Sequence, residues 1–311
     1  MNKTVLISGG AGFLGSHLCD FFLEKGFKVI SVDNFLTGSE ENISHLKLNP
    51  NFIFLNLDIT KNLEINNKVD YILHFASPAS PIDYLKMPIQ TLQVGSIGTQ
   101  NMLNIAEKNN ATILVASTSE VYGDPLQHPQ KENYFGNVNP VGPRGVYDEA
   151  KRYLEALATA YKNYRGISVR IARIFNTYGP RMRKNDGRAI PTFINQFLKN
   201  EPYTIFGDGK QTRSFCYVDD TIEGIYKLLF SNYSKPVNIG NPQELNLIEL
   251  IKIIDKFGNK RSTIKYLPMT ENDPKVRKPD MSLAKNLLDW YPKVSLEDGL
   301  LKSIRYFKSK K

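Results

Sequence analysis

Tyr147 and Lys151 are the residues of this sequence whose types and spacing are best suited to acid–base chemistry. Residues four apart on a helix project from the same face, so the phenol and the ammonium can converge on one point. An ammonium beside a phenol favours the phenolate, and we expect it to lower the tyrosine pKa from its ordinary value of about 10. Such a pair can exchange a proton with an alcohol that is becoming a ketone. The same spacing also arises by chance on amphipathic helices, where a core tyrosine and a solvated lysine need no function.

Three regularly spaced glycines near the N-terminus predict a phosphate-binding turn. Gly9, Gly12 and Gly15 follow a short apolar strand at 4–8 and precede an amphipathic helix that runs to about Lys25. In dinucleotide-binding proteins, glycines in this position make a tight turn, let the backbone approach a pyrophosphate and let the helix pack on the strand. The phosphates then lie at the helix N-terminus, where free N–H groups and the helix dipole favour anions.

The second predicted strand, at 28–32, ends at an acidic residue, Asp33. A carboxylate in this position accepts hydrogen bonds from the adenosine ribose hydroxyls and repels a 2′-phosphate, so NAD is favoured over NADP. The alternative is a turn-forming role, because Asn34 and Gly38 follow. Asp58 and Ile59, at the end of the third predicted strand, are candidates for contact with the adenine edge.

Strands alternate with helices through the first half of the chain. This order predicts an α/β fold with a Rossmann-type, doubly wound parallel sheet and helices on both faces. Further strands are expected at 52–57, 69–76, 111–116 and 167–174, with helices at about 88–108 and from Tyr147 onward. Ligands of such sheets bind beyond the carboxyl ends of the strands. Ser77, Ser117, Thr118 and Glu120 all follow strands at that edge, where Tyr147 and Lys151 are also expected.

The totals exclude several classes of protein. The chain has 311 residues, and its apolar runs all fall short of the ~20 residues that a membrane span needs. Two cysteines and four histidines without metal-ligand spacing predict neither a disulfide scaffold nor a zinc site, and a reducing cytoplasm is the expected location. The net charge of +9 comes mostly from dispersed lysines, so a solvated surface is favoured over nucleic-acid binding.

In its motifs, the sequence resembles the extended short-chain dehydrogenase/reductase superfamily and, more closely, the UDP-glucuronate decarboxylase (UDP-xylose synthase) family. The resemblance covers essentially the whole chain. It is carried by the glycine triplet and the Tyr147/Lys151 pair, and by the segments at 77–81, 117–125, 139–144, 172–182, 186–188, 211–215 and 277–280. The Thr-Ser-Glu triplet at 118–120 and Arg-Lys-Pro-Asp at 277–280 are the most specific of these.

Single residues distinguish this sequence from two related classes of enzyme. Sugar-nucleotide 4,6-dehydratases resemble this chain but typically carry an aspartate as acid where Ser119 stands. The 4-epimerases usually have a small or neutral residue in place of Glu120. One departure from the superfamily pattern is Gly95, which occupies the position of a common structural asparagine.

The resemblance implies two parts and their site residues. Residues 1–175 are expected to form the NAD-binding Rossmann domain, and 176–311 mainly a substrate-binding lobe with some segments returning to that domain. Beyond Ile190, short strands near Thr204 and Val237 and helices at about 219–230 and 247–256 predict this smaller mixed lobe. The residues expected to bind NAD are Gly9, Gly12, Phe13, Leu14, Gly15, Asp33, Asn34, Phe35, Thr37, Gly38, Asp58, Ile59, Phe75, Ala76, Ser77, Tyr147 and Lys151. Those expected to bind the substrate are Pro78, Tyr84, Ser119, Glu120, Asn176, Arg188, Gln211, Arg213 and Arg277.

The resemblance also implies a reaction. Oxidation at C4 of UDP-glucuronate gives a β-keto acid, which loses carbon dioxide, and reduction then gives UDP-xylose with NAD restored. The implied catalytic residues are Thr118, Glu120, Tyr147, Lys151 and Arg277. Alternatives are release of the UDP-4-keto-pentose, a related 4,6-dehydratase or 4-epimerase, or a catalytically silent NAD-binding regulator. A homodimer through the helices that begin near Pro88 and Val146 is expected.

Overall fold

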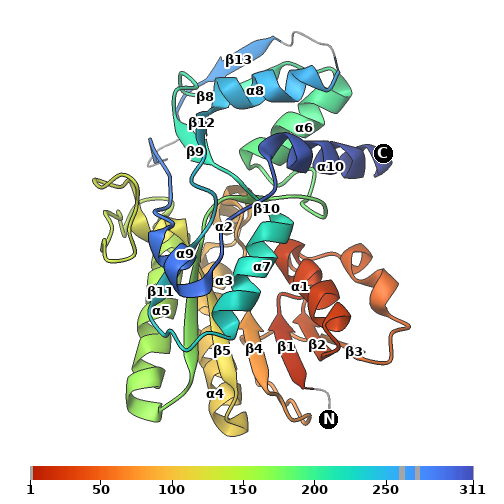
Figure 1. Ribbon diagram of the computed structural model, residues 1–311, viewed down its shortest axis with the longest axis vertical. Coiled ribbons are helices and arrows are strands. Elements are labelled where there is room, and N and C mark those ends of the chain that lie inside the picture. Colours follow the sequence, from red (N-terminus) through yellow and green to blue (C-terminus); the bar gives the residue numbers. More distant parts are fainter. Residues whose placement is uncertain (1–2, 259–262, 270–273, 311) are drawn as a thin grey trace.

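A seven-stranded parallel sheet forms the lower part of the molecule in Figure 1, a computed structural model that describes residues 3–258, 263–269 and 274–310. In spatial order its strands are β11 (Pro236–Ile239), β6 (Val169–Ile174), β5 (Thr112–Thr118), β4 (Tyr71–His74), β1 (Thr4–Ser8), β2 (Lys28–Asp33) and β3 (Phe52–Asn56). The order reverses at β1, and each neighbouring pair is parallel. The predicted doubly wound α/β class is confirmed.

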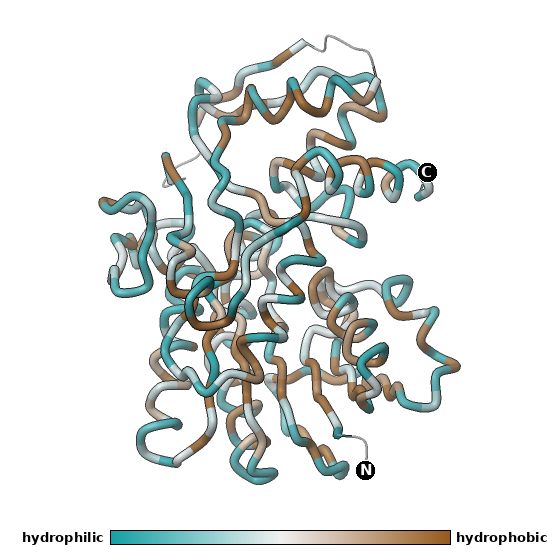
Figure 2. Tube along the Cα trace, viewed as in Figure 1, coloured by the Kyte–Doolittle hydropathy of each residue, from teal (hydrophilic) through white to brown (hydrophobic). Residues whose placement is uncertain are grey.

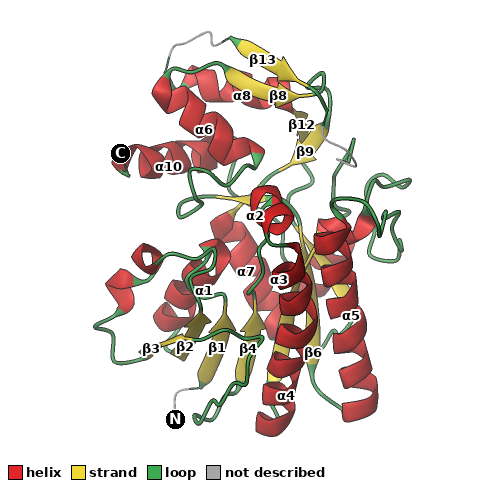
Figure 3. Ribbon diagram, turned by 180° about the vertical axis from the view of Figure 1, so that it is seen from behind, coloured by secondary structure: helices red, strands yellow, loops and turns green. Residues whose placement is uncertain are grey.

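Helices cover both faces of this sheet, as Figures 1 and 3 show from opposite sides. One face carries α1 (Phe13–Glu24) and α7 (Val218–Leu229), and the other carries α3 (Pro88–Gln93), α4 (Thr99–Asn109) and α5 (Gly145–Arg165). Successive strand residues serve opposite faces: Val5 and Ile7 join the core under α1, while Leu6 joins the core under α4 and α5. Strands buried on both faces are hydrophobic along their length, and Figure 2 shows this along the sheet.

The helix predicted at about 88–108 contains a wider turn. A π-helical segment, η3 (Val94–Gly98), joins α3 to α4. Gly95 lies in this segment against α5, and a Cβ added there would stand 2.7 Å from Cβ of Ala150 and 2.9 Å from its carbonyl oxygen. The glycine therefore permits η3 and α5 to approach closely. The asparagine that is common in the superfamily would not fit at this position without a shift of the backbone.

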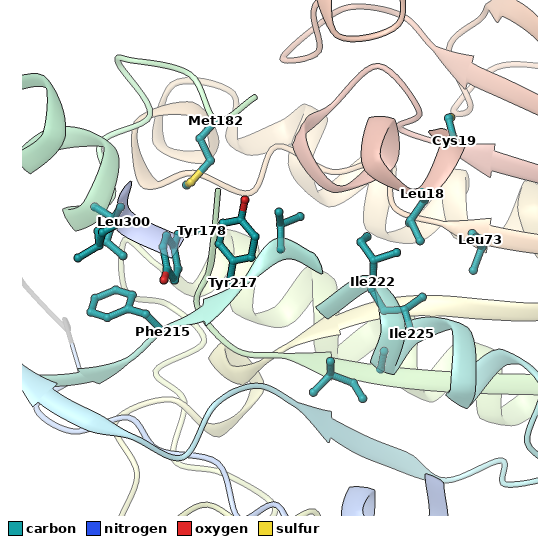
Figure 4. Close-up of a cluster of buried hydrophobic side chains, with 14 of the residues drawn as sticks. Leu18, Cys19, Leu73, Tyr178, Met182, Phe215, Tyr217, Ile222, Ile225 and Leu300 are labelled. Atoms are coloured by element: carbon teal, nitrogen blue, oxygen red, sulfur yellow. The ribbon is translucent and has the colours of Figure 1, made fainter. Parts of the chain in front are cut away.

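A smaller group of elements lies beyond the carboxyl edge of the sheet, at the top of Figure 1. It contains two small sheets, β8 with β13 in parallel and β9 with β12 antiparallel. Its elements are α6 (Ala189–Lys199), β8 (Tyr203–Phe206), β9 (Thr212–Ser214), β12 (Glu244–Asn246), α8 (Leu247–Lys256), β13 (Ile264–Leu267) and α10 (Leu296–Ser309). Figure 4 shows Tyr178, Phe215 and Leu300 continuing the core that begins with Leu18 and Ile222 under α1 and α7.

The strand predicted near Val237 does not lie in this smaller group. It is β11, which pairs with β6 in the main sheet, and α7 packs on the same sheet. Its amino-acid pattern resembles that of any short buried strand, so the pattern alone did not reveal its partner. The remaining elements are η1 (Glu40–Asn42), η2 (Ser44–Leu46), α2 (Pro81–Lys86), η4 (Ser119–Tyr122), β7 (Thr177–Tyr178), β10 (Cys216–Tyr217) and α9 (Ser282–Leu288).

Candidate active site

A cleft of about 920 Å³ runs along the carboxyl edge of the main sheet and reaches the smaller group of elements. It begins at the glycine-rich turn after β1 and extends to residues of β8 and β9. Every residue predicted to bind cofactor or substrate or to act in catalysis lines this cleft, except Phe35 and Gly38. These two instead surround Asp33: the backbone N–H of Phe35 donates to it, and a Cβ on Gly38 would lie 2.9 Å from its Oδ2.

The glycine turn between β1 and α1 is packed too tightly for side chains. Gly9 has a φ of +74°, which favours glycine, and a Cβ on Gly15 would stand 2.0 Å from the Gly9 carbonyl oxygen. Phe13 and Leu14, the first residues of α1, line the cleft immediately after this turn. The first turn of a 12-residue helix therefore faces the cleft across bare backbone, which suits a phosphate group.

The Asp33 carboxylate ends β2 at the floor of the cleft. Its Oδ2 accepts a hydrogen bond from the Ala11 N–H at 3.0 Å and its Oδ1 accepts one from the Phe35 N–H at 2.8 Å. Burial raises the pKa of Asp33, and these two backbone donors partly offset the rise. Each oxygen retains acceptor capacity for a ligand hydroxyl, so the fixed carboxylate suits a ribose better than a phosphate.

Tyr147 and Lys151 lie on the first two turns of α5, and both are buried. The Lys151 Nζ is 5.8 Å from the centre of the Tyr147 ring and donates to the Ala116 carbonyl at 2.8 Å. Burial lowers the pKa of Lys151 to about 8. The expectation of a lowered tyrosine pKa is wrong for this structure: burial and the negative charge of Glu120 raise the pKa of Tyr147, while a hydrogen bond with Thr118 opposes the rise. Tyr147 therefore holds its proton at neutral pH in the ligand-free fold.

Thr118 ends β5, and its side chain caps the element that follows. Its hydroxyl accepts from the Glu120 N–H at 3.3 Å at the start of η4, and the same side chain opposes the rise in the pKa of Tyr147. A capping role for Thr118 is thus compatible with its predicted catalytic role. Ser117 instead donates to Glu155 at 2.5 Å.

Glu120 is held between two arginines at the edge of the cleft. Arg144 Nη2 donates to Oε2 at 2.5 Å, and Arg277 Nη1 donates to Oε1. Their side chains are 16% and 3% exposed, and that of Glu120 is 14% exposed, so the ion pairs are largely shielded from water. Burial alone would raise the pKa of Glu120, but the two guanidinium groups outweigh it and lower the pKa to about 2.

Two further titratable side chains adjoin this group. Asp148 follows Tyr147 and is 5% exposed, and its Oδ1 has no hydrogen-bond partner among the described residues. Burial and the charge of Glu120 raise the pKa of Asp148 to about 7. Tyr84, on α2, stacks on Tyr147, and its buried hydroxyl likewise has no partner in the described part of the chain.

Four of the predicted substrate residues, Asn176, Arg188, Gln211 and Arg213, line the cleft from the end of β6 to β9 of the smaller group. Asn176 follows β6, and Gln211 precedes β9; the Nδ2 of the first and the Oε1 of the second are buried without a partner among the residues described. Arg188 pairs with Asp186, and Arg213 donates to the Thr212 carbonyl at 2.8 Å. Pro78 and Ser119 line the cleft as well. Partnerless buried polar atoms are costly, so this wall is suited to a polar ligand.

Sequence reasoning did not assign roles to several residues that line the cleft. The charged ones are the arginines Arg144, Arg181 and Arg183 and the acids Asp83 and Asp186. Arg181 pairs with Asp20, and Arg183 pairs with Asp83. Arg144 could have been found, because it directly precedes the helix that carries Tyr147. Among the described residues there is no group of three or more metal-ligating side chains and no helix long and apolar enough to cross a membrane.

Comparisons with known proteins agree with this geometry. Residues 5–240 match the NAD dependent epimerase/dehydratase family. UDP-glucuronic acid decarboxylase 1 of Danio rerio is 50% identical over 305 residues, which are 98% of this chain and 72% of that protein. UDP-glucuronic acid decarboxylase 1 of Arabidopsis thaliana is 47% identical over 98% of this chain and 70% of its own length.

Solved structures share the fold at lower identity. The UDP-glucuronic acid 4-epimerase of Bacillus cereus, in complex with UDP-glucuronic acid and NAD, superimposes with a TM-score of 0.88 at 31% identity, covering 99% of this chain and all of that one. The family match and the near-full-length identity to decarboxylases together place the sequence. The chain belongs to the NAD-dependent epimerase/dehydratase family and, within it, to the UDP-glucuronic acid decarboxylases.

Proposed function

We propose that this protein is an NAD-dependent decarboxylase that converts UDP-glucuronate to UDP-xylose. The observation that carries the proposal is the ionised Glu120 bracketed by Arg144 and Arg277 in the cleft that contains Tyr147. A sugar carboxylate entering this cleft meets two cations for recognition and one anion that repels it. At position 119, a serine lacks the acidity that a dehydratase needs at the C6 hydroxyl.

The residues that would hold NAD are present and fit it. The bare turn at Gly9 and Gly15 leaves room for a pyrophosphate at the first turn of α1, and the Asp33 carboxylate suits the ribose hydroxyls. The Bacillus cereus relative was solved with NAD. When bound, NAD supplies the acceptor for hydride from C4 of the sugar and later returns it.

Tyr147 is the general acid–base residue for the C4 hydroxyl. The phenol must first lose its own proton to solvent; as the phenolate it accepts the hydroxyl proton while the alcohol becomes a ketone, and it donates that proton back when the ketone is reduced again. Thr118, which ends β5 and lines the same cleft, shares the hydrogen bond to the same oxygen. Lys151 keeps an ammonium below about pH 8 close to the Tyr147 ring, where it stabilises the phenolate when that forms.

The 4-keto sugar is a β-keto acid, and the surroundings of Glu120 favour its breakdown. The bond between C5 and the carboxyl carbon breaks, carbon dioxide leaves, and the electron pair passes to the C4 oxygen as an enolate. C5 then takes one proton, so the net reaction consumes one proton for each carbon dioxide released. Arg277 binds the carboxylate, and the negative charge of Glu120 weakens the hold of the cations on it.

The substrate's nucleotide lies on the other wall. Asn176, Arg188, Gln211 and Arg213 would bind the UDP moiety, and guanidinium groups match phosphate oxygens well. This supports residues 1–175 as the NAD-binding part and 176–311 as mainly the substrate-binding part, with β11 and α7 returning to the main sheet.

We further propose a homodimer through the outer face of α3, α4 and α5. Ile89 on α3, Ile97 on the connecting segment η3 and Tyr153 on α5 are 62%, 44% and 50% exposed. The three helices run side by side in Figure 3. Such exposed apolar side chains are typical of an interface. Light scattering should give twice the chain mass for the wild type and a smaller value for Ile89→Asp.

A reducing compartment such as the cytoplasm fits the cysteines. Cys19 and Cys216 are free and buried, and burial raises the pKa of each thiol to about 12. Buried thiols of this kind are inert, and each of the two donates a weak hydrogen bond to a backbone carbonyl at 3.7 Å.

The direct test is incubation with UDP-glucuronate and NAD, followed by mass spectrometry of the nucleotide sugar and measurement of carbon dioxide. We expect carbon dioxide and UDP-xylose in equal amounts. A UDP-4-keto-pentose with equimolar NADH would shift the proposal to an enzyme that stops after decarboxylation. A product that keeps six carbons would overturn it.

A further inference from the structure

The backbone of Arg144 is hydrogen-bonded to the first turn of α5. Its carbonyl accepts hydrogen bonds from the Tyr147 N–H at 3.0 Å and the Asp148 N–H at 3.1 Å, and it is the N-terminal capping residue of the helix. Its guanidinium reaches across to Glu120, which follows β5 on a different element. One residue therefore connects the carboxylate to the helix that carries the proposed acid–base tyrosine.

Glu120 is held at both oxygens from two separate directions. Arg144 holds Oε2 from the start of α5, and Arg277 holds Oε1 from the segment at 274–280. Arg277 also lies 3.4 Å from the Gly123 carbonyl, to which it donates. Because each guanidinium takes one oxygen, the carboxylate cannot rotate without losing one of them.

Three further titratable groups interact with Glu120, and none of the three is a cation. Tyr84 on α2 and Tyr147 and Asp148 on α5 each interact electrostatically with Glu120. Neither tyrosine supplies a positive charge, and an ionised Asp148 would repel Glu120. With Arg144 removed, Arg277 would be the remaining cation in this group, and the carboxylate would be free to turn fully onto it.

We propose that Arg144 is a positioning residue that keeps Glu120 ionised and aimed into the cleft, and that it thereby leaves Arg277 able to bind the carboxylate of the substrate. This inference rests on the proposed decarboxylase function. Arg144 acts through Glu120, so its contribution appears mainly in the loss of carbon dioxide, and only a small effect reaches the oxidation at C4 through the influence of Glu120 on Tyr147.

The test is a double-mutant cycle on the full-length protein with NAD. Wild type, Arg144→Gln, Glu120→Gln and the double variant are compared for carbon dioxide release and for the rate of C4 oxidation, followed as NADH absorbance. Each single variant should lower carbon dioxide release about 10- to 100-fold, which is the effect of losing one charged hydrogen bond. C4 oxidation should stay within about threefold. The double variant should match Glu120→Gln, because residues that act through one another are not additive.

A pH profile provides a readout that a merely structural role would not change. Loss of Arg144 should raise the pKa of Glu120, so the acid limb of carbon dioxide release should move to higher pH in Arg144→Gln. Arg144→Lys retains the charge and should move the limb back toward the wild-type position. Arg165→Gln is the matched control, since it removes a guanidinium paired with Glu107 at 3.7 Å on the exposed far end of α5. It should leave both rates unchanged.

The possible outcomes separate the two levels of inference. If wild type releases carbon dioxide but the effects of Arg144→Gln and Glu120→Gln multiply in the double variant, Arg144 does not act through Glu120 and the positioning role is wrong. An unchanged acid limb in Arg144→Gln would overturn it as well. If wild type itself releases no carbon dioxide, the proposed function fails and this inference fails with it. A lowered unfolding temperature or lost NAD binding would identify a misfolded variant. If Arg144→Gln is misfolded, Arg144→Lys is compared with wild type in its place.

Discussion

The rings of Tyr84 and Tyr147 lie face to face, with centroids 5.2 Å apart and planes 9° from parallel. Tyr84 comes from α2 and Tyr147 from α5, so the stack fixes the orientation of the proposed acid–base residue from a second element. Tyr84 is 1% exposed and lines the cleft, and no described residue hydrogen-bonds its hydroxyl. A bound substrate is the natural partner for that hydroxyl.

Tyr84→Phe should therefore separate binding from orientation. The stack remains, so kcat should change little, while loss of one neutral hydrogen bond of about 0.5–1.5 kcal/mol should raise KM several-fold. Unfolding temperature should be equal or higher, because an unsatisfied buried hydroxyl is removed. Tyr84→Ala, which deletes the ring, should lower both stability and kcat. A Tyr84→Phe variant with unchanged KM would show that the hydroxyl does not meet the substrate.

Tyr147→Phe keeps the ring and removes the oxygen that exchanges the proton. C4 oxidation should fall by at least about 10²-fold, the usual contribution of a general acid–base group. NADH absorbance should not appear, while binding of UDP, measured by calorimetry, should persist. Near-normal turnover would mean that another group is the base.

The lowered pKa of Lys151 predicts that the stability of the ligand-free protein depends on pH. Burial lowers its pKa from 10.5 to about 8, so the unfolded chain binds more protons between these values. The free energy of unfolding should therefore gain a contribution that rises with pH from about 8 to 10, and burying the ammonium costs roughly 3 kcal/mol at neutral pH. Lys151→Met should be more stable at pH 7 and lack this rise, although inactive. Denaturant unfolding at pH 7, 8.5 and 10 checks this, and identical slopes for both proteins would contradict it.

Asp33 should determine the choice of cofactor. A 2′-phosphate placed beside its buried carboxylate costs several kcal/mol, so NAD should support activity at least about 100-fold better than NADP. Asp33→Asn should narrow this ratio mainly by improving NADP. Equal use of both cofactors by the wild-type apo-enzyme would remove this role from Asp33.

Arg277 should distinguish a charged sugar from a neutral one. Arg277→Ala should weaken UDP-glucuronate binding about ten- to a hundred-fold, since a charged hydrogen bond contributes roughly 1.5–3 kcal/mol. UDP-glucose has no carboxylate, so its binding should barely change. Equal weakening of both sugars, measured by calorimetry, would make Arg277 a general scaffold residue. Glu120→Gln should spare NAD binding and slow carbon dioxide release.

Local patterns predicted the sheet edge and most of the cleft lining. Gly9, Gly12 and Gly15 lie between a strand and a helix, and Tyr147 and Lys151 lie one turn apart, so each group is positioned by residues adjacent in sequence. Contacts over long separations were harder to predict. Arg144 meets Glu120 across 24 positions, and no periodic pattern marks such a pair.

The tyrosine pKa was predicted in the wrong direction for a related reason. Spacing indicates that Lys151 is near Tyr147, but it does not indicate burial or the charge of Glu120, and these two decide the direction. The π-helical turn at Gly95 was likewise missed, because its wider geometry depends on the packing against Ala150.

The position of β11 limits how this enzyme can be cut into fragments or recombined with its relatives. The chain leaves the main sheet for α6, returns for α7 and β11, and leaves again for β12 and α8. A fragment ending at residue 175 would expose the edge of β6 and the face that α7 covers, so it should aggregate instead of folding. Exchanging the smaller group of elements, the proposed sugar-binding part, between relatives would require grafting several separate insertions at once. Changes in sugar preference are therefore more accessible to point substitution than to domain shuffling.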